Sequence, residues 1–177
     1  RKLREINRHT GTTMILVTHD QSEAMSFADE VVVMEDGRVQ QSGRPEQLFE
    51  RPKNTFVGYF IGSPPINLFN AHVHPDSIEC PALSLSGIPR KQLALGSLQI
   101  GIRPEHIMLF EPADSDDFAI VEDCKNLGID RIISLRAANG ELFKVKSRLR
   151  QKIEIGDRLS VSVAKENVLV FQDGGLT

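Results

Sequence analysis

The 177-residue sequence has no tryptophan, a single tyrosine and two cysteines. Two cysteines, Cys80 and Cys124, are too few for a disulfide framework and suit a reducing compartment. The formal net charge is only -3, which excludes a strongly basic nucleic-acid-coating protein. No uncharged apolar run approaches the ~18 residues that a membrane-spanning helix needs. With 40% apolar residues, the composition is that of an ordinary globular chain, long enough for one or two domains.

The first residue is Arg1 rather than methionine, and no apolar signal-peptide stretch follows the basic start. We therefore expect the sequence to begin inside a larger protein, so that its function depends partly on residues outside it.

Residues 1–62 alternate between strand and helix patterns. Thr12–Thr18 is predicted to be a strand buried on both faces, as in a parallel α/β sheet. A helix capped by Asp20 follows it, and Val31–Met34 is a second strand of the same buried type. Asp36-Gly37 predicts a tight hairpin turn. Two short helices, over 46–50 and 56–61, complete the segment.

The pattern changes after Ser63-Pro64-Pro65, which cannot continue a helix and marks the best boundary. From Ile66 onwards short alternating strands dominate, and Asn139-Gly140 predicts a type I′ hairpin. Many short strands separated by turn residues favour a small barrel of the oligonucleotide/oligosaccharide-binding (OB) kind. The predicted division is an α/β segment at 1–62, a linker at 63–65 and an all-β domain at 66–177.

His19 is the sharpest chemical signal, because a parallel strand would deliver it to the carboxyl edge of the sheet. Ligands of open α/β sheets bind at that edge, and the N-terminus of the following helix favours anions. A neutral imidazole there could donate a hydrogen bond to a phosphate oxygen or orient a water molecule. The alternative is a histidine that merely ends the strand.

Three other groups of residues have both functional and ordinary interpretations. His72 and His74 share one face of a predicted strand and could start a zinc site, but no third ligand is evident and surface histidines are the simpler interpretation. The run Arg103–His106 could hold an anion or simply form a turn that leaves a strand.

Alternating basic residues in the last third of the chain would lie on one face of a continuous strand. They could bind nucleic acid or an acidic partner, or form a solvated face that protects a sheet edge. No aromatic residues are interleaved with them to stack bases, so we expect no nucleic-acid partner. This basic stripe consists of Lys144, Lys146, Arg148, Arg150 and Lys152.

A set of short motifs resembles the ATPase subunits of ATP-binding-cassette (ABC) carbohydrate importers, the maltose and glycerol-3-phosphate group. The first motif, residues 15–21 with the sequence ILVTHDQ, resembles their switch-histidine segment. The remaining matches are Glu23–Met25, Ala28–Asp29, Gly37–Val39, Gln41–Pro45, Phe56–Val57, Phe60–Pro64, Asn67 and Gly101–His106.

The resemblance implies that residues 1–62 are the C-terminal part of a P-loop ABC ATPase domain and that 66–177 are an OB-like (TOBE) regulatory domain. It implies that His19 contacts the γ-phosphate of ATP and helps to position the attacking water. The phosphate loop and the acidic pair that holds Mg²⁺ are absent and are expected before Arg1. ATP and Mg²⁺ would thus serve the intact protein only, and the fragment would be inactive and hold no metal.

In such an importer the subunit would be a peripheral protein on the cytoplasmic side of a bacterial or archaeal plasma membrane. Its partners would be a second copy of itself, integral membrane permease subunits and, indirectly, a periplasmic or extracellular solute-binding protein. The competing interpretation is a non-enzymatic OB module that senses a small anion or binds a regulatory protein.

Overall fold

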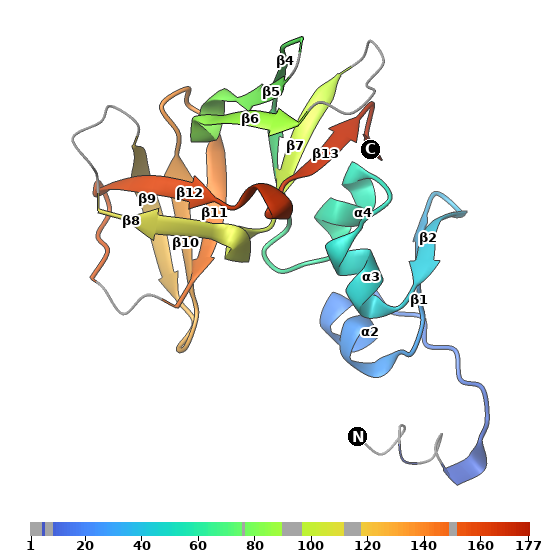
Figure 1. Ribbon diagram of the computed structural model, residues 1–177. Coiled ribbons are helices and arrows are strands. Elements are labelled where there is room, and N and C mark those ends of the chain that lie inside the picture. The colour runs from blue at the N-terminus through green and yellow to red at the C-terminus, as the bar shows by residue number, and fades with distance from the viewer. Residues whose placement is uncertain (1–4, 6–8, 76, 90–96, 112–117, 149–151) are drawn as a thin grey trace.

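The computed structural model describes residues 5, 9–75, 77–89, 97–111, 118–148 and 152–177. Two clusters of buried apolar side chains organise these residues, one drawn from positions 31–61 and the other from positions 69–163. Figure 1 shows the helices and the hairpin of the first cluster beside a body made almost wholly of strands. No helix in the described ranges is long and apolar enough to cross a membrane.

Three short helices and one hairpin surround the first cluster. They are α2 (Gln21–Phe27), β1 (Val31–Glu35), β2 (Arg38–Gly43), α3 (Pro45–Glu50) and α4 (Thr55–Phe60). Side chains at two of the helix starts satisfy free backbone donors, since Asp20 caps α2 and Asn54 caps α4. Residues Asp36 and Gly37 take left-handed φ values of 48° and 75°, as a type I′ hairpin requires. These local predictions are confirmed.

The predicted strand at Thr12–Thr18 does not form. The segment has no strand assignment, and Ile15 and Val17 are 89% and 92% exposed. A strand of this apolar type is stable only between neighbours in a covered sheet, and none of the described strands pairs with it. The same reason applies to β1, which pairs only with β2 and buries Val31 and Val33 while Val32 and Met34 stay exposed.

The β-rich part contains three antiparallel sheets and three single turns of 3₁₀-helix. The first sheet has the order β11 (Leu142–Ser147), β10 (Arg131–Arg136), β9 (Ala119–Asn126), β12 (Arg158–Val163) and β8 (Ile107–Phe110). The second has the order β14 (Gly175–Leu176), β13 (Leu169–Gln172), β7 (Leu98–Ile102) and β3 (Asn67–Asn70). The third consists of β4 (His72–Val73), β5 (Ser77–Cys80) and β6 (Leu85–Pro89). The turns are η1 (Pro81–Leu83), η2 (Pro104–His106) and η3 (Lys165–Asn167).

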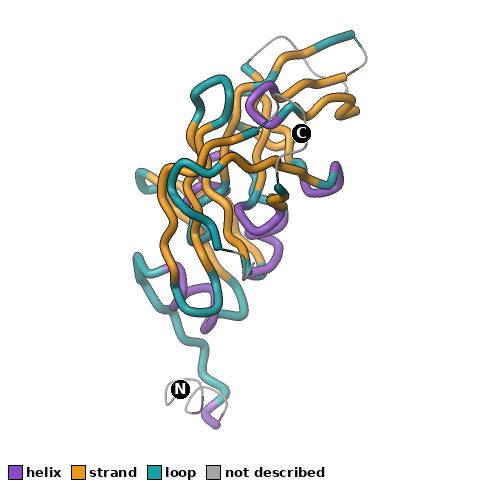
Figure 2. Tube along the Cα trace, turned by 90° about the vertical axis from the view of Figure 1, so that its left-hand side faces the viewer, coloured by secondary structure: helices purple, strands orange, loops and turns teal. Residues whose placement is uncertain are grey.

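All three sheets contribute side chains to one continuous core, and Figure 2 shows the strands (orange) away from the N-terminal segment. The side chain of Asn67 joins two of the sheets. Its Nδ2 donates to the Lys144 carbonyl oxygen at 2.8 Å, and its Oδ1 accepts from the Lys144 N–H at 2.8 Å. Asn67 on β3 thereby satisfies backbone groups on the outer edge of β11, where no further strand of that sheet follows. This mostly β architecture agrees with the predicted OB-like domain.

One turn differs from its prediction. Strands β10 and β11 do form the hairpin expected around Asn139-Gly140. However, only Gly140 has a left-handed φ (88°), and the Gly140 N–H donates to the Ala137 carbonyl. A type I′ turn needs positive φ at both central residues, so the predicted turn type is wrong. The loop is longer than two residues, which removes the steric demand that selects type I′.

Residues near the C-terminal end of the sequence return to the first cluster. The Thr55 N–H donates to the Gly174 carbonyl at 2.8 Å, and the Leu176 N–H donates to the Lys53 carbonyl at 2.9 Å. A β-bridge joins Asn54 to Gly175 between these two bonds. The β-rich part is therefore fastened to the start of α4 by main-chain hydrogen bonds (Figure 1).

Candidate functional site

His19 lies on an exposed turn that leads directly into α2. The side chains on either side of it fix the shape of this turn. The Thr18 Oγ1 accepts from the Asp20 N–H at 3.0 Å and donates to a Glu23 carboxylate oxygen at 3.1 Å. The imidazole is thus held on a structured turn, although no described strand delivers it there as the sequence predicted.

The N-terminus of α2 is not an open anion site. Its first free N–H groups, at Ser22 and Glu23, donate to the Asp20 carboxylate at 2.8 and 3.2 Å. A phosphate would meet these acidic side chains instead of unpaired N–H groups. Any contact of this turn with a phosphate must therefore come from the imidazole itself.

Arg103 is the one charged side chain among the described residues that is classed as buried, with 3% exposure. It follows β7 and reaches into the first cluster. Its Nη2 donates to the Phe49 carbonyl at 2.7 Å and its Nη1 to the Gly58 carbonyl at 2.9 Å, while the guanidinium stacks 4.2 Å from the Phe49 ring centre. Nη1 also donates to the Ile61 carbonyl. These carbonyls lie at the C-terminal ends of α3 and α4, where the helix dipoles favour a cation.

Burial lowers the pKa of Arg103 to about 10, because removal from water disfavours the charged form. The neighbouring Glu105 opposes that shift, and the group stays protonated at neutral pH. Its donors are directed at main-chain carbonyls, so the interpretation of Arg103–His106 as an anion site is not favoured. The side chain instead holds the two parts of the chain together.

The same region connects to the His19 turn through Gln21. The Gly62 N–H donates to the Gln21 Oε1 at 2.9 Å. Gly62 has a φ of 126°, and a Cβ atom there would lie 2.8 Å from Arg103 Nη1. Only glycine suits this position.

The two histidines of the possible zinc site lie at an exposed sheet edge. The His74 Nε2 is 2.8 Å from a Glu79 carboxylate oxygen, and His72 stands opposite Glu79 in the β4–β5 register. In the described part of the chain no group of three His, Cys, Asp or Glu side chains could hold a metal ion. The described contacts of this pair, the one between His74 and Glu79 included, lie at the surface.

The basic stripe is largely paired with acids. Lys146 and Arg148 both contact Asp130, at 3.4 and 3.1 Å, and their hydrogen bonds and charges lower the pKa of that half-buried carboxyl, with the Arg148 hydrogen bond as the largest cause. Lys152 contacts Glu154 at 2.5 Å. The strand ends at Ser147, so the stripe is not one continuous face, and Arg150 lies outside the described residues. A solvated face explains these charges.

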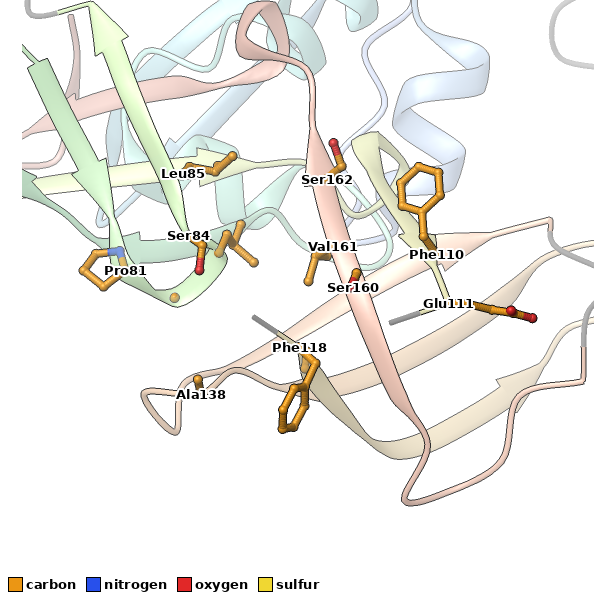
Figure 3. A pocket seen from close by; sticks show the side chains of 13 residues that line it. Pro81, Ser84, Leu85, Phe110, Glu111, Phe118, Ala138, Ser160, Val161 and Ser162 are labelled. Atoms are coloured by element: carbon orange, nitrogen blue, oxygen red, sulfur yellow. The ribbon is translucent and has the colours of Figure 1, made fainter. Parts of the chain in front are cut away.

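A pocket of about 470 Å³ lies where η1 meets β12 (Figure 3). Its wall includes Ser160, Val161 and Ser162 from β12, with Phe110 and Glu111 on one side and Phe118 on the other. None of the described side chains that line it is basic, and Glu111 is acidic. The charge of the wall thus gives no support to the small-anion alternative.

Comparison with known proteins identifies the β-rich part. A family model described as the TOBE domain matches residues 100–171. Residues 100–171 resemble a TOBE domain, and the β-rich part from residue 66 onwards is called the TOBE domain below. The match begins within β7, ends within β13 and includes Arg103, so the side chain that reaches α3 and α4 lies in the matched segment.

The relatives extend the match over almost the whole chain. The sn-glycerol-3-phosphate import ATP-binding protein UgpC of Psychromonas ingrahamii is 33% identical over 177 residues, 96% of this chain and 47% of that protein. The trehalose/maltose import ATP-binding protein MalK of Thermococcus litoralis is 36% identical, covering 87% of this chain and 46% of that protein. The xylose/arabinose import ATP-binding protein XacK of Haloferax volcanii is 33% identical, covering 96% and 46%. The predicted resemblance to carbohydrate-importer ATPase subunits is confirmed, and the chain spans just under half the length of these relatives.

The sequence did not indicate the long-range contacts of three residues. Arg103 and Gln21 make contacts at the junction between the TOBE domain and the rest, and Asn67 joins two sheets within the β-rich part. Each makes its contact with residues more than 30 positions away. One signal was present in the sequence. An arginine directly follows the apolar strand Leu98–Ile102, and a charge buried at such a position needs hydrogen-bond partners.

Proposed function

We propose that the intact protein is the ATP-binding, ATP-hydrolysing subunit of an ABC importer that energises uptake of a sugar or a glycerol-phosphate-type solute. The observation that carries this proposal is the similarity to import ATP-binding proteins over 96% of the chain, including both the His19 segment and the TOBE domain. A free-standing OB module would explain only the second of these.

Within this proposal, residues 1–62 are the C-terminal part of the nucleotide-binding domain, 63–65 a linker and 66–177 the regulatory domain. The segment Met14–Val17 would form a central strand of the ATPase sheet, and its exposed apolar side chains would then be covered by the neighbouring parts of the intact protein. The separate buried clusters in 31–61 and 69–163 support this division.

His19 would be the catalytic residue. An exposed imidazole on a turn held by Thr18, Asp20 and Glu23 can present one ring N–H to a γ-phosphate oxygen or to the attacking water. Such a bond stabilises charge as it shifts in the transition state, so it would act on kcat more than on ATP affinity.

The residues of this chain supply only this one group towards ATP. The sequence contains no Gly-x-x-x-x-Gly-Lys-Ser/Thr loop, and its described residues form no metal-binding group, so Mg²⁺ does not fit here and would be held elsewhere in the intact protein. At the cytoplasmic face of the membrane, the further partners would be a second copy and integral membrane permease subunits. A periplasmic or extracellular solute-binding protein would be contacted indirectly.

The test compares two proteins. The intact protein should release phosphate from Mg-ATP, and the 177-residue chain should neither bind Mg-ATP in isothermal titration nor hydrolyse it. An intact protein without hydrolysis would contradict the ATPase assignment. Micromolar binding by the 177-residue chain would contradict the placement of the nucleotide pocket outside it.

A further inference from the structure

One peptide group lies between the His19 turn and the TOBE domain. Its carbonyl, that of Ile61, accepts a hydrogen bond from Arg103 Nη1, and its N–H, that of Gly62, donates to Gln21 Oε1 at 2.9 Å. We propose that this peptide group couples the position of the His19 turn to the orientation of the TOBE domain, with Gln21 and Arg103 as positioning residues. The functional meaning of this coupling rests on the proposed role of His19.

The coupling follows from the stiffness of the peptide unit. Partial double-bond character keeps the carbonyl and the N–H in one plane, so neither end can rotate without the other. Gly62 has no side chain that could separate the plane from the guanidinium, and a Cβ would approach Arg103 Nη1 to 2.8 Å. A displacement of the Arg103 guanidinium therefore reorients the Gly62 N–H, and a displacement of the Gln21 amide reorients the Ile61 carbonyl.

The TOBE end of the link is rigidly placed. Arg103 directly follows β7, the inner strand that pairs with both β3 and β13. Its guanidinium is 3% exposed and is also held by the Phe49 and Gly58 carbonyls. Rotation of the β7 sheet would therefore move the guanidinium and its carbonyl partners together.

The other end of the link is the first residue of α2, two positions after His19. Asp20 ties this helix start to the turn through the Ser22 and Glu23 N–H groups. Helix α2 buries no residue completely and packs against the first cluster through the partly buried Ala24 and Met25, so its displacement costs less than that of a fully buried helix. Movement of the His19 turn would therefore displace the Gln21 side-chain amide, and displacement of that amide would move the turn.

The first experiment uses the 177-residue chain and needs no nucleotide. In Arg103→Lys, amide hydrogen exchange at Gly62, Ser22 and Glu23 should accelerate at least about fivefold relative to the TOBE core. Arg136→Lys is the matched control, because Arg136 bonds to Glu122 on the surface at 2.6 Å. Unchanged exchange at Ser22 and Glu23 in the folded Arg103→Lys protein would overturn the proposal.

A variant at the other end of the link, Gln21, tests the coupling even if Arg103→Lys does not fold. Gln21→Ala removes a half-buried side chain and should shift the NMR signal of the Arg103 Nε–Hε group, which bonds to the Phe49 carbonyl. Gln41→Ala should not, although Gln41 also bonds to main-chain groups, those of Arg51 and Lys53. An Arg103 signal at the wild-type position in Gln21→Ala would overturn the coupling.

The second experiment uses the intact protein and ATP hydrolysis. Gln21→Ala and Arg103→Lys should each lower kcat about two- to tenfold with an unchanged KM. The kcat of the double variant should be no lower than that of the less active single variant. Multiplicative losses would contradict a shared link. Absence of hydrolysis in the wild-type intact protein would overturn the proposed function, whereas exchange and NMR signals in the 177-residue chain decide the coupling independently.

Discussion

At the scale of single residues, the His19 imidazole and the Arg103 guanidinium differ in exposure and therefore in the contacts that they can make. His19 is exposed on a turn whose shape is fixed by its neighbours, so its imidazole is available for contacts outside the described residues. Arg103 is buried and directs its donors to main-chain carbonyls. Exposure thus distinguishes the residue suited to chemistry from the residue suited to assembly.

His19→Ala in the intact protein should abolish most ATP hydrolysis while leaving ATP binding largely intact. A hydrogen bond that strengthens as charge shifts in the transition state is worth ~3–4 kcal/mol in comparable electrostatic sites, or some 10²–10³ in rate. Measurement of kcat, ATP affinity and melting temperature on the same variant checks this. Near-normal kcat in a folded variant would reject the catalytic role.

The two thiols should react very differently. Burial raises the pKa of Cys80 to about 11, and its side chain is fully buried, whereas Cys124 is only half-buried. A rise from 9.0 to about 11 lowers the thiolate fraction of Cys80 at pH 8 about a hundredfold. In a thiol titration with a disulfide reagent at pH 8, we expect Cys80 to react only after unfolding. Rapid modification of Cys80 in the native chain would contradict its burial.

At the scale of elements, β7 depends on a glycine that no turn requires. A Cβ atom on Gly101 would lie 2.5 Å from the Phe171 ring and 2.8 Å from Ile66 Cδ1, both of which pack against this strand. Gly101→Ala should therefore lower the free energy of unfolding by roughly 1–3 kcal/mol, the usual cost of overpacking a core. Urea unfolding of this variant measures the loss.

Gly175→Ala is the matched control, since its nearest neighbour would be 3.5 Å from the new Cβ and its φ is not left-handed. Equal losses in the two variants would show that the close approach of Phe171 does not explain the effect, since Gly→Ala at an unstrained position should not destabilise the fold.

Elements specified by neighbours in sequence were predictable. The Asp36-Gly37 turn and the Asp20 cap each need only residues within a few positions, and both are present as expected. The strand at Thr12–Thr18 failed because its stability depends on adjacent strands that the described chain does not supply. The Asn67 and Arg103 contacts span 77 and 54 positions, so no local pattern could indicate them.

The candidate site was predictable to the same limited extent. Its histidine was found from the motif, whereas Gln21 and Arg103 gained their roles only when the fold brought Gly62 between them.

At the scale of the whole molecule, the TOBE part should fold without the first cluster. The 20 buried residues of its main cluster lie at positions 69–163, away from the first cluster, and a chain of ~110 residues can bury an independent core. Circular dichroism of a polypeptide of residues 66–177 should show a cooperative melting transition. A disordered polypeptide would contradict the proposed boundary at 63–65.

The same polypeptide should self-associate if, as proposed, the intact protein has a second copy of itself as a partner and the TOBE domain helps to hold the two copies together. Analytical ultracentrifugation checks this expectation. A folded strict monomer would contradict the dimer and leave the boundary intact.

The bridge between Asn54 and Gly175 has a consequence for how the molecule is made. Its two residues are separated by about 120 positions in the chain. At ~5–20 residues per second, the ribosome reaches Gly175 roughly 6–24 s after Asn54. During that interval the Thr55 N–H at the start of α4 cannot donate to the Gly174 carbonyl, because Gly174 has not yet been synthesised. The junction between the two parts can therefore be completed only after the residues of β3 to β13 have been synthesised.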